Sequence, residues 1–191
     1  MPSRKVNLLI FQFCITSFFC NQIADAISVT TKSYDPSCGV SVRIDEENKE
    51  AKKALVLEWD TQEGSTQLSL NISGDGALVR SVAVASGDSK PVVVLRDADP
   101  ITVLSIGQRD LKKRGGWNIF FDPTSRKLSK SGPLTLKLKS VAVRSEGNRC
   151  IVDINELQGS AFSGKLRFTL YAGCELIHLQ SIIQTQKDAR A

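Results

Sequence analysis

Apolar and polar residues alternate along most of the chain after residue 26, and this period of two is typical of strands with one buried face. The alternation is clear in two runs of apolar positions, Leu55, Leu57 and Trp59 and then Leu68, Leu70 and Ile72. The turn residues 73–76 follow, and Val82 and Val84 resume the pattern beyond them. Residues 66–86 are therefore predicted to form a hairpin.

The apolar positions change parity within residues 134–144. They stand first at Leu134, Leu136 and Leu138 and afterwards at Val141 and Val143. A regular strand keeps its apolar side chains on one face, so the change requires an extra residue near Lys139 and Ser140. We predict a β-bulge there, or a bend that carries the strand from one sheet to another.

Two segments do not alternate in this way. Residues 91–95 form a continuous apolar run, Pro-Val-Val-Val-Leu, which predicts a short strand buried on both faces. Residues 44–54 carry many charges and few apolar anchors. A charged loop, or at most one helical turn, is therefore predicted for them.

Turn signals along the chain separate roughly eleven to twelve short strands, with little or no helix after the first 26 residues. The predicted fold class is all-β, an antiparallel β-sandwich. No internal repeat, low-complexity tract or linker divides residues 27–191, so we expect a single domain. Because the chain stops straight after a predicted strand, this domain could also be the N-terminal part of a larger architecture.

Residues 1–26 have the pattern of a secretory signal peptide. Arg4 and Lys5 give a positive start, residues 6–19 are largely apolar, and Ala24-Asp25-Ala26 matches a small–x–small cleavage site. The apolar run is shorter than the roughly 20 residues that span a bilayer, and no second candidate follows. We therefore predict a protein that is secreted or held in the periplasm or cell envelope, with no transmembrane segment beyond the signal.

The charge and the aromatic content restrict the partners. The formal net charge is +5 without a long run of one sign, which favours anionic partners and does not require nucleic acid. Aromatic residues make up only 6% of the chain, too few for a platform that stacks single-stranded nucleic acid. We expect no nucleic-acid partner.

Three cysteines, Cys38, Cys150 and Cys174, remain once the signal peptide is removed. They allow one disulfide and one free thiol, in any of three pairings. No C-x-x-C motif occurs, which argues against a zinc knuckle and against a dithiol redox centre.

The one histidine of the chain lies in residues 164–186, which are predicted to form a hairpin around the turn 172–175. If Tyr171 pairs with Leu176, the apolar faces of the two strands coincide and His178 lies across from Thr169. The opposite, polar face then carries the candidate ligand-binding residues Arg167, Thr169, Tyr171, His178 and Gln180. Two other interpretations of the histidine remain: a solvent-facing or locally hydrogen-bonded side chain, and a catalytic one.

Other catalytic or metal chemistry has little support in the sequence. One histidine excludes a multi-histidine metal centre, and neither a G-x-S-x-G elbow nor a phosphate-binding glycine loop occurs. Asp97 and Asp99 are interpreted as turn residues, with a calcium site as the alternative. We assign no catalytic residue, no metal ligand and no cofactor, and a pair of carboxylates is the remaining route to an enzyme.

A basic loop is a second candidate site, with the cations Arg109, Lys112, Lys113 and Arg114. Together with Arg126, Lys127 and Lys130 it could form a positive patch for an anionic polysaccharide, a phosphate-bearing surface or another subunit. The alternative is a pair of solvated loops. Trp59 and Trp117 both show the spacing of core residues rather than that of an exposed surface for stacking on sugar.

The last 30 residues, FSGKLRFTLYAGCELIHLQSIIQTQKDARA, resemble a segment of large β-sandwich domains in secreted bacterial proteins, of the galactose-mutarotase-like supersandwich kind. The resemblance covers residues 162–191 and rests on the glycines, the Phe-Thr pair and the tyrosine. It implies a carbohydrate-related context, since such sandwiches often bind or process carbohydrate.

Three functions are open at this point. The first is an exported, non-catalytic β-sandwich that binds an oligo- or polysaccharide, anionic ones included, or that serves as an accessory domain at the cell surface. The second is a carbohydrate-active enzyme of the supersandwich type, or a fragment of one. The third is a structural or protein-interaction module whose sheet edges pair with a partner.

Overall fold

The computed structural model describes residues 27–47, 52–107, 128–159 and 161–187. Twelve strands in these residues form two five-stranded sheets and one two-stranded ribbon. Sheet A has the order β1 (Ser28–Ser33), β9 (Thr135–Glu146), β10 (Arg149–Gly159), β11 (Phe162–Tyr171) and β12 (His178–Thr185). Sheet B has the order β2 (Val40–Glu47), β3 (Lys52–Asp60), β4 (Gly64–Asn71), β5 (Val79–Ser86) and β6 (Val92–Ala98). The ribbon pairs β7 (Val103–Gly107) with β8 (Leu128–Pro133).

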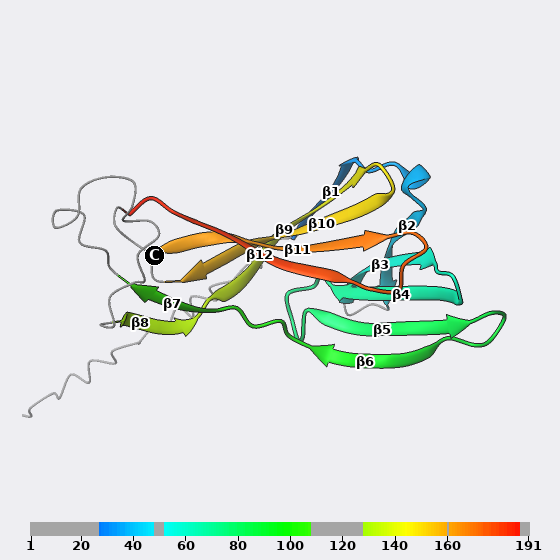
Figure 1. Ribbon diagram of the computed structural model, residues 1–191, viewed down its shortest axis with the longest axis horizontal. Helices are drawn as coiled ribbons and strands as arrows, with labels where there is room; N and C mark the ends of the chain where they lie inside the picture. The colour runs from blue at the N-terminus through cyan, green and yellow to red at the C-terminus, as the bar shows by residue number, and fades with distance from the viewer. Residues whose placement is uncertain (1–26, 48–51, 108–127, 160, 188–191) are drawn as a thin grey trace, which may run out of the picture.

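The two large sheets are layered on each other, and the β7–β8 ribbon lies beyond one end of the sandwich (Figure 1). Side chains from both sheets share one apolar core. Its largest fully buried members include Leu55, Leu57, Trp59, Leu68 and Leu70 of sheet B and Ile154, Leu157, Leu166 and Leu170 of sheet A. The predicted all-β sandwich is confirmed. One strand pair departs from the antiparallel pattern, because β1 runs parallel to β9.

The hairpin predicted for residues 66–86 is formed by β4 and β5. Asn71 holds its turn, since the Asn71 side-chain oxygen accepts a hydrogen bond from the Ser73 N–H at 2.9 Å and the Asn71 amide donates to the Asp75 carbonyl. Gly74 and Gly76 have φ angles of 89° and 82°, in the left-handed region that residues with a side chain disfavour. The turn residues therefore specify the hairpin locally.

The parity change within residues 134–144 coincides with a shift in the pairing of β9 with β10. Asn155 pairs with Ser140, but the next registered pair is Leu157 with Leu136. Residues 137–139 of β9 therefore stand opposite a single residue of β10, which is an irregularity of the bulge type. This confirms the prediction and lets the leucines before the shift and the valines after it pack against the same core.

The prediction of a charged loop over residues 44–54 is wrong, because β2 and β3 form a hairpin there. Its charges are paired across the strands. Arg43 Nη1 lies 3.2 Å from Glu58 Oε2, and Lys53 Nζ lies 2.8 Å from Glu46 Oε1. Ion pairs between neighbouring strands let a charge-rich sequence adopt an extended conformation while its apolar side chains face the core.

The prediction that residues 91–95 are buried on both faces is also wrong. Most of the run lies in β6, the last strand of sheet B, at the lower edge of the molecule in Figure 1. Val92 and Val94 are 63% and 60% exposed, and Val93 and Leu95 are exposed as well. A continuous apolar run fits a buried strand or an apolar edge strand equally well, and its residue pattern does not distinguish them.

Polar contacts join the β11–β12 turn of sheet A to β3 of sheet B. The Trp59 indole N–H donates to the Cys174 carbonyl at 2.7 Å, and the Gly173 N–H donates to the Asp60 carbonyl at 2.8 Å. Trp59 is 2% exposed, as its spacing predicts. These bonds fix the end of β3 against the hairpin that carries the histidine.

The predicted signal segment, residues 1–26, lies outside the described residues. In the part of the chain that the structure covers, no helix has the length and the apolar character needed to cross a bilayer. The predictions of a signal peptide and of export therefore stay predictions.

Replacing Leu57 with Ala should destabilise the protein strongly. Leu57 is 0% exposed, and truncating such a side chain costs about 3 kcal/mol in the free energy of unfolding. The matched change Leu176→Ala removes the same atoms from a side chain that is 76% exposed, so it should cost less than about 0.5 kcal/mol. Urea denaturation followed by tryptophan fluorescence measures both, and equal losses would contradict this placement of the core.

Candidate functional site

Side chains of β9–β12 that point away from the core make a polar surface, the outer face of sheet A. The strand register places Thr169 opposite His178 and Arg167 opposite Gln180, as the hairpin sequence predicts. Cross-strand partners share a face, so these four side chains lie together. Tyr171 continues the same face along β11, two residues beyond Thr169.

The five candidate ligand-binding residues differ in what they offer to a ligand. His178 and Gln180 are exposed, and Tyr171 is 38% exposed. Thr169 is only 4% exposed, so its side chain offers almost no surface that a ligand could contact. The Arg167 side chain is 22% exposed and is engaged by a carboxylate. The structure thus brings all five onto one face and leaves three of them open to solvent.

Arg167 belongs to a charge cluster with Lys165 and with Asp153 of β10. Arg167 Nε lies 2.6 Å from Asp153 Oδ1, Arg167 Nη2 lies 2.9 Å from Oδ2, and Lys165 Nζ lies 2.7 Å from Oδ2. Burial by itself would raise the pKa of the Asp153 carboxyl, but the hydrogen bonds from Arg167 and Lys165 outweigh burial and lower this pKa. Asp153 is therefore ionised at neutral pH, and the cluster carries one net positive charge.

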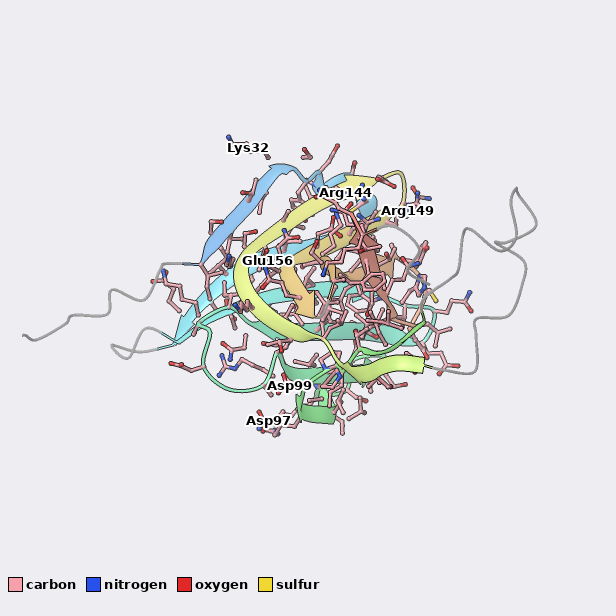
Figure 2. The ribbon with its side chains drawn as sticks, turned by 90° about the vertical axis from the view of Figure 1, so that its left-hand side faces the viewer. Lys32, Asp97, Asp99, Arg144, Arg149 and Glu156 are labelled. Atoms are coloured by element: carbon pink, nitrogen blue, oxygen red, sulfur yellow. The ribbon has the colours of Figure 1, made fainter. Side chains whose placement is uncertain are left out.

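Basic residues extend this positive character over sheet A. The acidic residues of its strands are Glu146, Asp153 and Glu156, and the basic ones are Lys32, Lys137, Lys139, Arg144, Arg149, Lys165 and Arg167. Arg144 and Arg149 both pair with Glu146, with Arg149 Nη2 at 2.8 Å from Glu146 Oε2. Figure 2 shows Arg144 and Arg149 on one side of the molecule and Asp97 and Asp99 on the other. Sheet A is therefore the side suited to an anionic ligand.

A groove of about 820 Å³ lies at the end of sheet A away from the histidine. Four of its lining residues form one cross-strand row over β9, β10, β11 and β12: Thr135, Gln158, Ser163 and Gln184. Each member pairs with the next in the strand register, so the four share one face. This is the outer face of sheet A, because Ser163 and Arg167 stand at positions of equal parity on β11.

The side chains that line the groove include amides, hydroxyls and two cations, and its described members include neither Asp nor Glu. Besides the row and Gly159, it consists of Lys137, Ala161, Phe162, Thr185, Gln186 and Lys187. The Thr185 hydroxyl donates to the Ala161 carbonyl at 2.6 Å, which holds the end of β12 against the connection between β10 and β11. The lining suits a ligand that carries many hydroxyl groups and some negative charge.

Glu156, which stands next to this lining, is engaged by its neighbours. Lys139 Nζ lies 2.8 Å from Glu156 Oε2. Hydrogen bonds from Lys139 and then from Gln158 lower the pKa of the Glu156 carboxyl. The Glu156 carboxylate is thereby ionised at neutral pH and neutralises the charge of Lys139.

The basic-loop residues Arg109, Lys112, Lys113 and Arg114 lie outside the described residues, and so do Arg126, Lys127 and Trp117. Lys130 falls in β8. The positive patch formed by these two loops therefore stays a prediction.

Asp99 makes a long-range contact, since Asp99 Oδ1 accepts a hydrogen bond at 2.7 Å from the N–H of Leu78, just before β5. Asp97 has a φ angle of 50°, a conformation that Asp tolerates better than most residues with a side chain. Among the described residues, no group of three or more His, Cys, Asp and Glu side chains is arranged to hold a metal ion.

Comparisons of the chain with protein-family models, with curated proteins and with solved structures give no match. Function is therefore inferred from the chemistry of this chain's own residues.

The groove is the feature that sequence reasoning missed. Its row joins Thr135 to Gln184 through two intervening strands, so it exists only once four strands have taken their register. The sequence contains only a weak signal for this groove. Gln158, Gln184 and Gln186 all stand near the ends of strands, but an amide at a strand end is common in any β-sandwich.

Replacing Asp153 with Asn should lower the free energy of unfolding by about 2 kcal/mol at neutral pH, because Arg167 and Lys165 then face a neutral partner. Folding lowers the pKa of Asp153. The ionised form thus stabilises the fold above the unfolded pKa of about 3.9, and this stabilisation is lost as the pH falls through the lower folded pKa. The melting temperature of the wild type should fall more steeply below about pH 4 than that of the variant.

Thermal unfolding from neutral to acid pH measures this difference. Asp88→Asn makes the same chemical change at an exposed position of the β5–β6 turn, and it should follow the wild type. An Asp153→Asn variant as stable as the wild type at neutral pH would contradict the role given to the cluster.

Proposed function

We propose that the protein is an exported, non-catalytic β-sandwich that binds an acidic polysaccharide on sheet A, with the groove as its binding site. The observation that carries this proposal is the lining of the groove. It offers three amide side chains, hydroxyls and two lysines, without a carboxylate among its described members.

Each part of the lining matches a chemical feature of such a ligand. Amide and hydroxyl side chains both donate and accept hydrogen bonds, as the hydroxyl groups of a sugar do. Lys137 and Lys187 supply point charges for carboxylate or sulfate groups. An acidic polysaccharide presents hydroxyl groups and negative charge in every repeat.

Two features of the sequence support export and a carbohydrate-related role. The pattern of residues 1–26 favours export, which would bring the protein to polysaccharides outside the cytoplasm. The segment 162–191, which resembles galactose-mutarotase-like sandwiches, contains Phe162, Ser163 and 184–187, which are more than half of the groove's lining.

Binding is favoured over hydrolysis by the absence of a carboxylate pair from the described lining. Glycosidic cleavage uses two such groups on either side of the scissile bond. Glu156 beside the groove is ion-paired with Lys139. Among the described residues of this groove, the enzyme alternative therefore has no carboxylate pair to carry it.

The lysines provide the first test. Replacing Lys137 or Lys187 with Gln should weaken binding of the full chain to a soluble acidic polysaccharide about tenfold each, because each change removes one charge-assisted contact. Lys32→Gln makes the same charge change on β1 of sheet A, outside the groove, and should bind as the wild type does. Titration calorimetry with an acidic and a neutral polysaccharide, each at low and moderate salt, measures the four proteins.

Each outcome is informative because Lys137 and Lys187 are exposed and their replacement should leave the fold intact. Equal weakening by Lys32→Gln would mean that the general charge of sheet A, and not the groove, is recognised. If the folded wild type binds neither polysaccharide, the proposal is wrong.

A second candidate function is self-association through β6, and the observation that favours it is the exposed apolar edge. Within the described residues β6 is hydrogen-bonded to β5 alone, so its other edge is open to a further strand. A second copy of this chain is the occupant that we propose. In an antiparallel pair centred on Val94, Val93 stands opposite Leu95, Lys90 stands opposite Ala98, and no like charges face each other.

Replacing Val94 with Lys should abolish this association, because the two-fold axis would place the two new ammonium groups opposite each other. Leu176→Lys adds the same charge to another side chain that is largely exposed, and it should leave association unchanged. Sedimentation equilibrium gives the masses. A wild type that stays monomeric at millimolar concentration would exclude this candidate.

A further inference from the structure

Cys38 and Cys150 come from different parts of the sandwich and meet in its core. Cys38 ends the short 3-10 helix η1 (Pro36–Cys38), just before β2 of sheet B, and Cys150 lies in β10 of sheet A. Both side chains belong to the same buried core cluster, as free thiols that are 2% and 0% exposed. A disulfide requires two backbone segments that are held close together with their side chains turned toward each other.

Contacts that do not involve sulfur fix the backbone around this pair. Ser145 is the β9 partner of Cys150, and it exchanges two hydrogen bonds with Asp35. The Asp35 N–H donates to Ser145 Oγ at 3.0 Å, and the Ser145 hydroxyl donates to the Asp35 carbonyl at 2.9 Å. Asp35 also caps η1, because Asp35 Oδ1 accepts from the Ser37 N–H at 2.9 Å. The turn that presents Cys38 is thus anchored on the strand beside Cys150.

The residue that follows Cys38, Gly39, is also packed closely against sheet A. Gly39 has a φ angle of 78°, and a Cβ there would come within 2.6 Å of the Ala172 Cβ. Ala172 follows β11, in which Leu170 is the partner of Cys150. Residues 34–40 therefore form a turn that packs on the strands on both sides of Cys150.

From this geometry we propose that Cys38 and Cys150 form a disulfide that joins the start of sheet B to sheet A, and that Cys174 remains a thiol. Of the three pairings that the sequence allows, this is the pairing whose members share one buried core cluster, to which Cys174 does not belong. Cys174 lies instead in the β11–β12 turn, where its carbonyl accepts the Trp59 hydrogen bond. The inference does not depend on the proposed polysaccharide binding.

The bond would form by thiol–disulfide exchange with a disulfide oxidant, such as oxidised glutathione or the disulfide of a thiol oxidoreductase. One protein thiolate attacks a sulfur of the oxidant and releases one thiolate from it. The second protein thiolate attacks the resulting mixed disulfide and releases the other. Two electrons pass to the oxidant, and the protons lost by Cys38 and Cys150 are taken up by its two sulfurs.

Burial determines when this exchange can occur. Desolvation, and then contact with Cys38, raises the pKa of the Cys150 thiol to about 12, so the folded, reduced protein holds little Cys150 thiolate at neutral pH. The oxidant also has no access to either sulfur. Exchange therefore takes place before residues 34–40 close over β10, and the finished bond is shielded from reductants by the same packing.

Refolding of the reduced full chain in a mixture of reduced and oxidised glutathione, followed by alkylation of the remaining thiols and digestion with trypsin, tests the pairing. Trypsin separates the three cysteines into peptides 33–43, 150–165 and 168–187. The expected product is a reducible link between 33–43 and 150–165, with peptide 168–187 recovered in alkylated form. Recovery of 33–43 and 150–165 as alkylated peptides would overturn the proposal, and so would a link from either to 168–187 or to the peptide 6–32.

The contribution of this disulfide to stability can be measured by thermal unfolding with and without reductant. The bond closes a loop of roughly 110 residues, so reduction during unfolding should lower the melting temperature by roughly 10 °C. Cys174→Ser should show the same drop, whereas Cys38→Ser/Cys150→Ser should show none. An equal response to reductant in all three proteins would also overturn the proposal.

Discussion

The single apolar layer between the two sheets is the constraint on which the rest of the structure depends. Leu57 and Trp59 of sheet B and Ile154 and Leu166 of sheet A belong to the same buried core. Neighbouring residues in a strand point to opposite faces, so the choice of core residues also determines which side chains point outward. The polar outer face of sheet A follows directly from this, with its Asp153 cluster and its groove.

This constraint explains what could be predicted from the sequence and what could not. In residues 164–186, matching the apolar faces of two adjacent strands selects one register, and the structure has that register. Features that depend on residues far away in the sequence could not be predicted. Residues 91–95 have the pattern of a buried strand, but β6 is exposed because sheet B ends there. The charges of residues 44–54 indicated a loop because the ion pair between Glu46 and Lys53 exists only once β2 and β3 have paired. The groove needs four strands in register before its row exists.

Burial divides the outer face of sheet A into two parts with different roles. Around Asp153 the cations are held by a buried carboxylate, so this part stabilises the fold. At the far end, Lys137 and Lys187 are exposed and line a groove without a carboxylate in its described lining, so their charge is available to the ligand that we propose. Because the two clusters are separate, changes in the groove should alter binding without altering stability, and changes at Asp153 should do the reverse.

The most direct test of the central claim, that the groove at the end of sheet A is a binding site for an acidic polysaccharide, is to map the contact by NMR. Backbone amide shifts of the isotope-labelled protein would be followed during titration with an acidic oligosaccharide. The proposal predicts that the shifted amides cluster in residues 135–137, 161–163 and 184–187. Shifts confined to β6 or to sheet B, or no shifts at saturating ligand, would contradict it.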